Sequence, residues 1–311
     1  MNDAQAVRVW MEAMRRGNFS LGWNISDLLM RQRRVQDRKK PPRCFQMVWD
    51  GSSVKGKRVL VACFHGLGDT IQFIRYAALL KEVAAEVIVW AQPSLIALLR
   101  TVKGIDQLLP LYHGMPNMEY DIEVELGELP YVFRTTLGNI PAQIPYILVQ
   151  PAPLERKANL QVGLIWQSGR WNPRRSVPFS KIQRLAQVPG IDWHIMQHDP
   201  WGAGWDGKLG VISGGDYLWD DARVMRALDL VITVDTMTAH LAGALGQQTW
   251  TLLPFNADWR WLLRRNDSPW YPTMRLFRQR KQGRWEALID EVASELKKLG
   301  ASHIEGLLSC D

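Results

Sequence analysis

The chain has 311 residues, of which 47% are hydrophobic and 22% charged, and its formal net charge at pH 7 is +7. This length and composition indicate a soluble globular protein with room for two domains of ordinary size. No apolar run approaches the roughly 20 residues that span a bilayer, and the first ten residues, MNDAQAVRVW, contain no hydrophobic signal core. We therefore expect a cytoplasmic protein, with peripheral association at the inner face of the membrane left open.

The charged and sulfur-containing residues narrow the choice of partners. Cys44, Cys63 and Cys310 lack the spacing of a zinc site or a CxxC motif, which favours a reducing compartment and no structural metal. The positive charge suits nucleic acid, a nucleotide sugar or an anionic surface. The basic clusters Arg31–Lys40 and Arg278–Arg284 belong to no recognisable nucleic-acid-binding module. We interpret them as solvated faces and expect no nucleic-acid partner.

The first 42 residues predict a helical hairpin, because apolar residues recur at helical spacing in Ala6–Arg16 and again in Trp23–Arg34. Residues 43–155 then predict a first Rossmann-like α/β domain, in which apolar strands alternate with helices. The expected strands are residues 58–64, 86–91, 105–109 and 121–126, and the expected helices are residues 69–83, 93–102 and 128–135.

Residues 156–311 repeat this alternation and predict a second Rossmann-like domain. The expected strands are residues 161–166, 192–197, 211–213, 230–234 and 249–253, and the expected helices are residues 180–187 and 216–227, one that opens at Asp235, and a closing helix at 285–299. Open α/β sheets bind ligands at the carboxyl ends of their strands. We therefore expect the two domains to face each other across a cleft that holds the site.

The stretch Leu230–Gly246, LVITVDTMTAHLAGALG, predicts a buried strand that runs directly into a helix. Asp235 and Thr236 are good N-cap residues, and Gly246 stands where a C-cap belongs. A helix N-terminus at the carboxyl end of a parallel strand favours an anion, and Thr236 and His240 would add hydrogen-bond donors there. An ordinary capped helix with a packed histidine explains the same pattern.

The turn His65-Gly66-Leu67-Gly68-Asp69-Thr70 follows the first strand of the first domain. Its glycines allow a sharp strand-to-helix turn, but the third glycine of a dinucleotide fingerprint is missing, so NAD binding is weakly supported. Asp69 is either a helix cap, since Asp69 followed by Gln72 resembles a capping box, or a general base that projects into the cleft. The spacing slightly favours the cap.

Two loops carry further candidate residues. The segment Trp166–Pro178, WQSGRWNPRRSVP, follows a strand and brings together Gln167, Ser168, Arg170, Arg174 and Arg175, which suit a phosphate or form a solvated surface loop. The aromatic and basic segment Pro254–Tyr271 follows the strand that we take to be the last one. It lines the cleft or packs between domains, and the sequence does not decide.

In their order, the segments HGLGDTIQFIRYAALL, RRSVPF, VDTMTAHLAGALG and LLPFNADWRWLLRRNDSPWYP resemble glycosyltransferase family 9. They are more similar still to the glycosyltransferase module that follows tetratricopeptide repeats in many bacterial proteins. The likeness covers about residues 43–280, and the hairpin, with Arg16-Gly17-Asn18-Phe19 and Gly22-Trp23, is similar to a remnant of one repeat. The resemblance implies a GT-B fold, with an acceptor-binding first domain and a nucleotide-sugar-binding second one.

The resemblance also implies metal-independent, inverting transfer without a cofactor, as in the ADP-heptose lipopolysaccharide heptosyltransferases. The proposed catalytic base of those enzymes matches Asp69, in the turn that holds Gly66 and Gly68. Their donor-phosphate lysine has Arg175 as its nearest match, and this change of geometry leaves the donor sugar open. The remaining donor-binding candidates are Gln167, Ser168, Arg170, Asp235, Thr236, Met237, Thr238 and His240.

We therefore predict a glycosyltransferase of the hexosyl or heptosyl type that moves a sugar from a nucleoside diphosphate to an envelope glycan, a glycolipid or a protein. Without a metal, Arg175 and the helix N-terminus near Asp235 would stabilise the leaving diphosphate electrostatically. The alternative from another class is a non-catalytic protein that binds nucleotide sugars or acts as a scaffold and has kept the fold. An oxidoreductase is a distant third interpretation.

Overall fold

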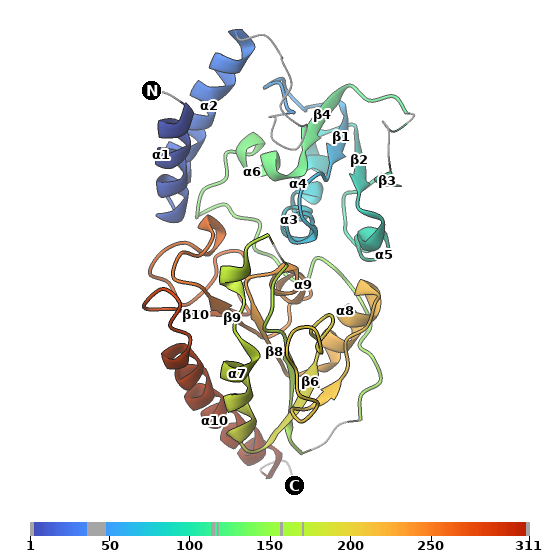
Figure 1. The fold of residues 1–311 in the computed structure, drawn as a ribbon. Coiled ribbons are helices and arrows are strands. Elements are labelled where there is room, and N and C mark those ends of the chain that lie inside the picture. The colour runs from blue at the N-terminus through green and yellow to red at the C-terminus, as the bar shows by residue number, and fades with distance from the viewer. Residues whose placement is uncertain are drawn as a thin grey trace. The chain divides into compact units, whose positions relative to one another are not determined.

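A computed structural model describes residues 3–35, 48–112, 116, 118–155, 158–169 and 171–308 (Figure 1). The predictions for Arg170, Cys44, Cys310 and residues 36–40 of the first basic cluster lie outside these residues. The chain forms two compact units: Met1–Ile147 with Asp258–Arg265, and Leu148–Ala257 with Asn266–Asp311. The first unit therefore includes a short segment that comes from the second half of the sequence.

The N-terminal hairpin is present as predicted and consists of α1 (Asp3–Arg15) and α2 (Phe19–Val35). The chain turns between them at Gly17, whose φ of +76° is a left-handed conformation that glycine adopts at little cost. The Trp23 indole donates a 2.6 Å hydrogen bond to the carbonyl of Thr135, and Asp27 forms an ion pair with Arg134. The hairpin is thus packed against the body of its own unit.

The first sheet is parallel, with the strand order β3-β2-β1-β4. Its strands are β1 (Arg58–Ala62), β2 (Glu86–Ala91), β3 (Gln107–Pro110) and β4 (Ile122–Glu125), and its helices are α3 (Leu67–Phe73), α4 (Tyr76–Val83), α5 (Ile96–Leu99) and α6 (Leu129–Val132). The single helix expected over residues 69–83 is wrong. The Arg75 side chain donates a hydrogen bond to the Gln72 carbonyl, and the Ala77 N–H donates to the Ile74 carbonyl. The regular α-helical hydrogen-bond pattern is therefore interrupted there.

The second sheet is also parallel and has six strands in the order β10-β9-β8-β5-β6-β7. Its strands are β5 (Leu160–Leu164), β6 (Ile191–Ile195), β7 (Val211–Ile212), β8 (Leu230–Val234), β9 (Thr249–Leu253) and β10 (Met274–Arg278), and its helices are α7 (Phe179–Ile182), α8 (Leu218–Ala227), α9 (Met237–Ala244) and α10 (Glu286–Leu308). Strand β10 was not predicted, and the prediction that β9 is the last strand is wrong. Read from β7, the order is that of a doubly wound dinucleotide-binding sheet.

The central strands are buried along their whole length, as the continuous apolar runs predicted. In β5, β8 and β9 every residue is buried, because helices cover both faces of a doubly wound sheet. The closing helix α10 contributes Leu288, Ile289 and Val292 to the core that these strands share, and it contacts α7 beside it (Figure 1). Each such side chain contributes about 1.5–3 kcal/mol through burial.

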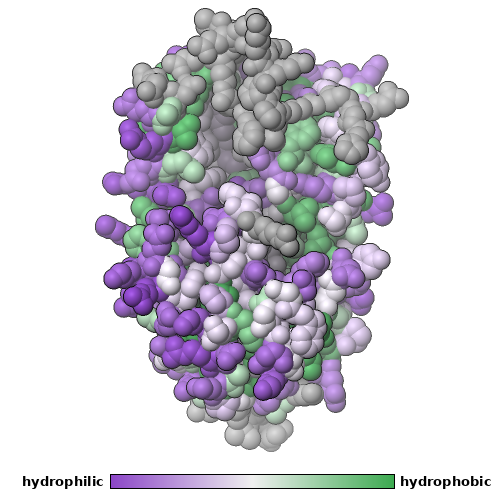
Figure 2. Space-filling model, viewed as in Figure 1, coloured by the Kyte–Doolittle hydropathy of each residue, from purple (hydrophilic) through white to green (hydrophobic). Residues whose placement is uncertain are grey.

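The surface of the described residues is mixed in polarity. On the face that Figure 2 draws, hydrophilic side chains are interspersed with hydrophobic ones. Exposed aromatic residues among the described ones are Tyr112, Trp171, Trp201, Tyr217 and Phe255. Within the described part of the chain, no helix combines the length and the apolar character that crossing a membrane requires.

Candidate functional site

Both sheets change winding direction beside their first strand, and this is where parallel α/β sheets bind ligands. In the first sheet the change occurs between β1 and β4, which pair in parallel with Ala62 opposite Glu125. In the second it occurs between β5 and β8, which pair with Leu164 opposite Ile232. The residues that follow these four strands form one candidate cluster in each unit.

Asp69 lies in the first turn of α3, directly after the turn that follows β1. The capping box that the sequence suggested with Gln72 is wrong, because α3 begins at Leu67 and Gln72 is a buried interior residue. Asp69 instead occupies the third helical position, and its Oδ2 accepts a 3.0 Å hydrogen bond from the N–H of Gly66, the N-cap. Gly68 lies within the helix. Asp69 therefore caps α3 and also keeps part of its carboxylate accessible, since 33% of its side chain is exposed.

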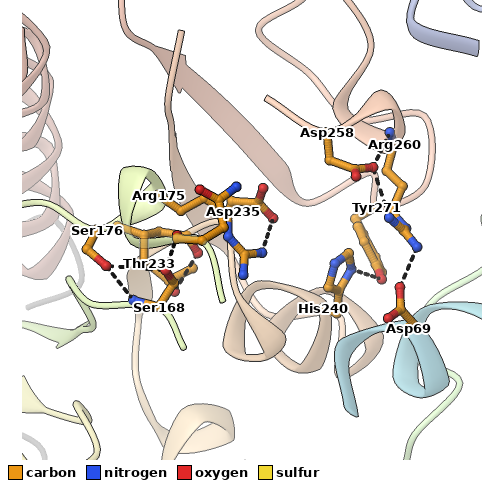
Figure 3. Close-up of polar contacts among 12 residues, drawn as sticks. Asp69, Ser168, Arg175, Ser176, Thr233, Asp235, His240, Asp258, Arg260 and Tyr271 are labelled. Carbon is orange, nitrogen blue, oxygen red and sulfur yellow. Dashed lines mark hydrogen bonds and ion pairs between the residues drawn. The ribbon is translucent and has the colours of Figure 1, made fainter. Parts of the chain in front are cut away.

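The second oxygen of Asp69 forms an ion pair with Arg260 (Figure 3). Arg260 lies in η6 (Trp259–Trp261), within the segment that the second half of the sequence contributes to the first unit. Its other terminal nitrogen lies 2.9 Å from Oδ1 of Asp258, which also caps η6 by accepting from the Arg260 N–H. The sequence analysis singled out the loop that contains Arg260 but assigned the residue no role.

Glu125 adds a second acidic group at the same edge of the first sheet. It ends β4, accepts a hydrogen bond from the N–H of Gly127, and lies 3.7 Å from the imidazole of His65. Burial, together with the neighbouring charges of Glu128 and Asp69, raises the pKa of Glu125 to about 8. Glu125 is therefore mostly neutral at pH 7. An acidic residue at the end of the predicted strand 121–126 was a signal that the sequence analysis did not use.

The loop after β5 is held in shape by its own polar groups. The Ser168 N–H donates to the Ser176 hydroxyl at 3.0 Å, and Oε1 of Gln197 accepts from the N–H groups of Trp166 and Gln167. The Gln167 side chain is exposed, whereas that of Ser168 is buried. Gln197 lies just after β6, the strand that pairs with β5, and is a structural partner that the sequence did not reveal.

Arg175 lies in this loop, with its guanidinium 5.0 Å above the ring of Trp171 and 3.8 Å from Asp235 (Figure 3). Asp235 directly follows β8 and is buried. The Nε of Arg175 is buried and has no hydrogen-bond partner among the described residues. A buried donor without a partner costs about 1–3 kcal/mol, so this position favours an acceptor from a ligand or solvent.

The helix after β8 begins at Met237, not at Asp235 as the sequence predicted, and Thr236 is its N-cap. Thr236 and Met237 are half-buried and Thr238 is buried. At the other end, Gly246 has a φ of +71°, and the N–H groups of Gly246 and Gln247 donate to Gly243 and Ala242. This is a Schellman motif and confirms Gly246 as the stop signal.

His240 lies one turn into α9 and is 6% exposed. Its Nδ1 lies 2.9 Å from the hydroxyl of Tyr271, in the segment before β10 (Figure 3). Gly243 is required next to this contact, because a Cβ there would lie 2.4 Å from the Tyr271 ring. His240 is therefore packed and hydrogen-bonded, as one of the two interpretations of the sequence predicted. A role for His240 in ligand binding stays a prediction.

Comparison with known proteins finds a curated relative and solved structures of similar fold. No family model matches the chain. A curated relative, Protein FlbA from Caulobacter vibrioides, is 26% identical over 294 residues, which cover 82% of this chain and 48% of the relative. The chain thus spans about half the length of this curated relative.

Two solved structures are similar. The crystal structure of the glycosyl transferase family 9 protein from Veillonella parvula has a TM-score of 0.58 at 12% identity and covers 82% of this chain and 99% of that one. The structure of E. coli ADP-heptose lps heptosyltransferase II has a TM-score of 0.54 at 14% identity and covers 79% and 99%. These likenesses confirm the predicted fold, two parallel-sheet α/β domains of the GT-B type found in family 9 structures.

The residue assignments rest on the geometry alone. The structure brings Gly66, Gly68 and Asp69 together after β1, and it brings Ser168, Arg175 and Asp235 together at the edge of the second sheet. No group of three or more His, Cys, Asp or Glu among the described residues is placed to hold a metal ion. The predicted cleft between the domains, the donor role of residues 236–240 and the independence from metal stay predictions.

Proposed function

We propose that this protein is a metal-independent, inverting glycosyltransferase that takes a sugar from a nucleoside diphosphate and transfers it to a glycan, glycolipid or protein acceptor. The single observation that carries the proposal is the pair of polar clusters at the two sheet edges, each at the change of winding direction. One offers a carboxylate that can accept a proton, and the other offers a cation and a helix N-terminus that can hold a diphosphate. The family 9 fold supports this assignment.

The second unit would bind the donor. The buried Nε of Arg175 has no partner among the described residues and can donate to a phosphate oxygen, and α9 directs the N–H groups of its first turn to the same edge. Asp235 lies between these groups, where an anion would be repelled, so we assign its carboxylate to a sugar hydroxyl. As the glycosidic bond breaks, the diphosphate gains negative charge, which Arg175 and the helix N-terminus would stabilise.

The first unit would supply the base. In an inverting transfer the acceptor hydroxyl attacks the anomeric carbon, and a group on the acceptor side must take its proton. Asp69 has an exposed carboxylate fixed by Gly66 and Arg260, whereas the nearby Glu125 is mostly neutral at pH 7. General-base assistance of this kind is typically worth about 10²–10⁴-fold in rate.

A two-step experiment tests the proposal. Thermal-shift measurements with nucleoside diphosphates and their sugars first identify the donor, since a ligand at about 100 times its dissociation constant stabilises by about 2.7 kcal/mol. The selected donor is then incubated with glycan, glycolipid and protein acceptors in the presence of EDTA, and release of the nucleoside diphosphate is measured. We expect release that depends on the acceptor and survives EDTA. Binding without turnover on any acceptor would support the non-catalytic alternative, and the absence of any nucleotide binding would overturn both.

A further inference from the structure

We propose that Arg260 is a positioning residue for Asp69, and that the N-terminal hairpin acts in catalysis by holding the segment that carries Arg260. The inference rests on the proposed function, because it takes Asp69 as the base. It assigns a task to two parts of the chain that the sequence left without one, the helical hairpin and the aromatic loop after β9.

The first step is the contact that fixes Asp69. One oxygen of its carboxylate accepts from the Gly66 N–H and the other pairs with the Arg260 guanidinium, so both ends of the group are anchored. An aspartate that is one-third exposed would otherwise exchange rotamers. With both oxygens held, the carboxylate keeps one orientation, and the exposed third of the side chain leaves access for an acceptor hydroxyl.

The second step is the support of Arg260 itself, whose side chain is only 19% exposed. Asp258 binds both the side chain and the backbone N–H of Arg260, and the rings of Phe73 and Trp259 each lie 5.3 Å from its guanidinium carbon. Cation–π contacts of this kind are worth about 0.5–2 kcal/mol each and restrict the planar group further. Arg260 is thus held before any substrate binds.

The third step connects η6 to the hairpin. Trp259 packs edge-to-face against Trp10 of α1 at 5.9 Å and against Phe19 of α2 at 5.8 Å, and it stacks on Phe73 at 6.4 Å. The N–H of Leu263 also donates a 2.9 Å hydrogen bond to the carbonyl of Arg15, at the end of α1. The hairpin therefore covers the residue next to Arg260 and ties down the far end of the segment.

The direction of the effect follows from these contacts. Without Arg260, Asp69 keeps only the Gly66 anchor, and its charge still acts on the neighbouring carboxyl group of Glu125. Loss of orientation slows the chemical step, because a displacement of about 1 Å can cost about 10²-fold in rate. Donor binding depends on the other unit and should not change. A purely structural role for Arg260 would instead lower stability and leave the turnover of the folded protein intact.

The first test compares Arg260→Ala, Arg260→Lys and Arg58→Ala. Arg58 pairs with Asp121 at the opposite end of β1 and serves as the matched control. We expect Arg260→Ala to lower kcat by about 10–10²-fold with the donor KM within about twofold. Arg260→Lys should retain more turnover, and about 50 mM guanidinium should restore part of the kcat of Arg260→Ala whereas equal urea should not. Arg58→Ala should match the wild type.

The second test asks whether the hairpin acts through Arg260. We expect Phe19→Leu, which removes the ring that contacts Trp259, to lower kcat about 3–10-fold in the wild type and by less than twofold when combined with Arg260→Ala. Leu28→Ala, at an exposed site on α2, is the control and should leave kcat unchanged. Thermal melting confirms that each variant is folded, and Trp10→Phe replaces Phe19→Leu if the latter unfolds.

The outcomes separate this inference from the function on which it rests. Suppose that Asp69→Asn abolishes transfer. If Arg260→Ala then keeps the wild-type kcat, or if guanidinium restores none of the kcat that Arg260→Ala has lost, the positioning role is overturned and the proposed function stands. Independent effects of Phe19→Leu and Arg260→Ala would overturn the part assigned to the hairpin. A wild-type protein that transfers no sugar from any donor would overturn the proposed function and this inference with it.

Discussion

The two sheets carry polar groups at the same topological position, but these groups are mainly acidic in the first sheet and mainly electropositive in the second. Beside the first strand of each sheet, the chain leaves a buried strand and enters a helix at the carboxyl edge. In the first unit this edge holds carboxyl groups, Asp69 and Glu125, with one arginine brought from a distant segment. In the second it holds Arg175 and the N-terminus of α9, with Asp235 as the acidic partner.

Under the proposed function, this difference would let one architecture serve the two halves of a transfer. A proton must be accepted where the hydroxyl attacks, and negative charge must be stabilised where the diphosphate leaves. The first edge provides a charged carboxylate beside a neutral one, and the second provides a donor, Arg175, whose Nε has no partner in the described part of the chain. The fold supplies the position, and a few side chains after β1, β4, β5 and β8 supply the chemistry.

The largest effect expected is at Asp69. Asp69→Asn keeps an acceptor oxygen for the Gly66 N–H but removes the charge and the proton-accepting capacity, so kcat should fall by about 10²–10⁴-fold while donor binding stays nearly intact. Steady-state kinetics and calorimetric titration of the nucleoside diphosphate measure the two quantities. Asp121→Asn, which breaks the ion pair at the other end of β1, is the matched control. Unchanged turnover in Asp69→Asn would show that Asp69 is not the general base. The proposed contrast between a proton-accepting first edge and a phosphate-binding second edge would then be wrong.

Most of the fold was predictable because its strands are continuous apolar runs. The bounds of β2, β8 and β9 match the sequence prediction, since these strands are buried on both faces and flanked by clear turn signals. The missed strand β10, MRLFR, lies at the edge of the sheet, and two half-buried arginines interrupt its apolar residues, so it lacks a continuous apolar run. The break between α3 and α4 depends on the Arg75 side chain and has no local signal.

The candidate site was predictable only where its residues follow a strand directly. The starts of the helices near Asp69 and Asp235 could be located to within two residues, because the end of an apolar strand is visible in the sequence. Arg260 could not, since it lies 191 residues from Asp69, and the segment that carries it belongs to the first unit although its neighbours in sequence belong to the second. Long-range contacts of this kind depend on tertiary packing, which periodicity and spacing do not encode.

The next largest effect is expected at Glu125, the carboxyl group of raised pKa at the first edge. The pKa of Glu125 in the folded protein, about 8, lies above the usual value of 4.5, so between these values the folded state binds more protons than the unfolded state. The corresponding stability is present below pH 4.5 and is lost as the pH rises through 8. Relative to Glu125→Gln, the wild type should therefore lose roughly 2–4 kcal/mol of unfolding free energy between pH 5 and 9, since one pKa unit is worth about 1.4 kcal/mol.

Urea unfolding of both proteins across this pH range measures the difference. Parallel curves for the wild type and Glu125→Gln would show that Glu125 is ionised at neutral pH. The first edge would then carry two negative charges, and a different residue would have to balance them.

A smaller effect is expected at the second edge. Arg175→Ala should lower kcat/KM for the donor by about 10–10²-fold, because a hydrogen bond to a charged group is worth about 1.5–3 kcal/mol. The kcat/KM of Arg175→Lys should lie between those of the wild type and Arg175→Ala, since lysine keeps the charge but lacks the planar guanidinium. Arg174→Ala is the control, because this neighbour is exposed. If Arg174→Ala and Arg175→Ala behave alike, the donor phosphates are bound elsewhere.

The smallest effect separates the stability of α9 from the chemistry at its N-terminus. At Gly246, with its φ of +71°, an alanine must adopt a left-handed conformation that costs about 1–2 kcal/mol. Gly246→Ala should lower the unfolding free energy by about that amount, whereas Gly215→Ala, whose added Cβ would meet no atom within 4 Å, should change it little. Because Gly246 lies at the opposite end of the helix from Thr236, kcat and the donor KM of the folded Gly246→Ala protein should match the wild type. A loss of donor affinity without a loss of stability would mean that the whole length of α9, and not only its first turn, responds to the donor.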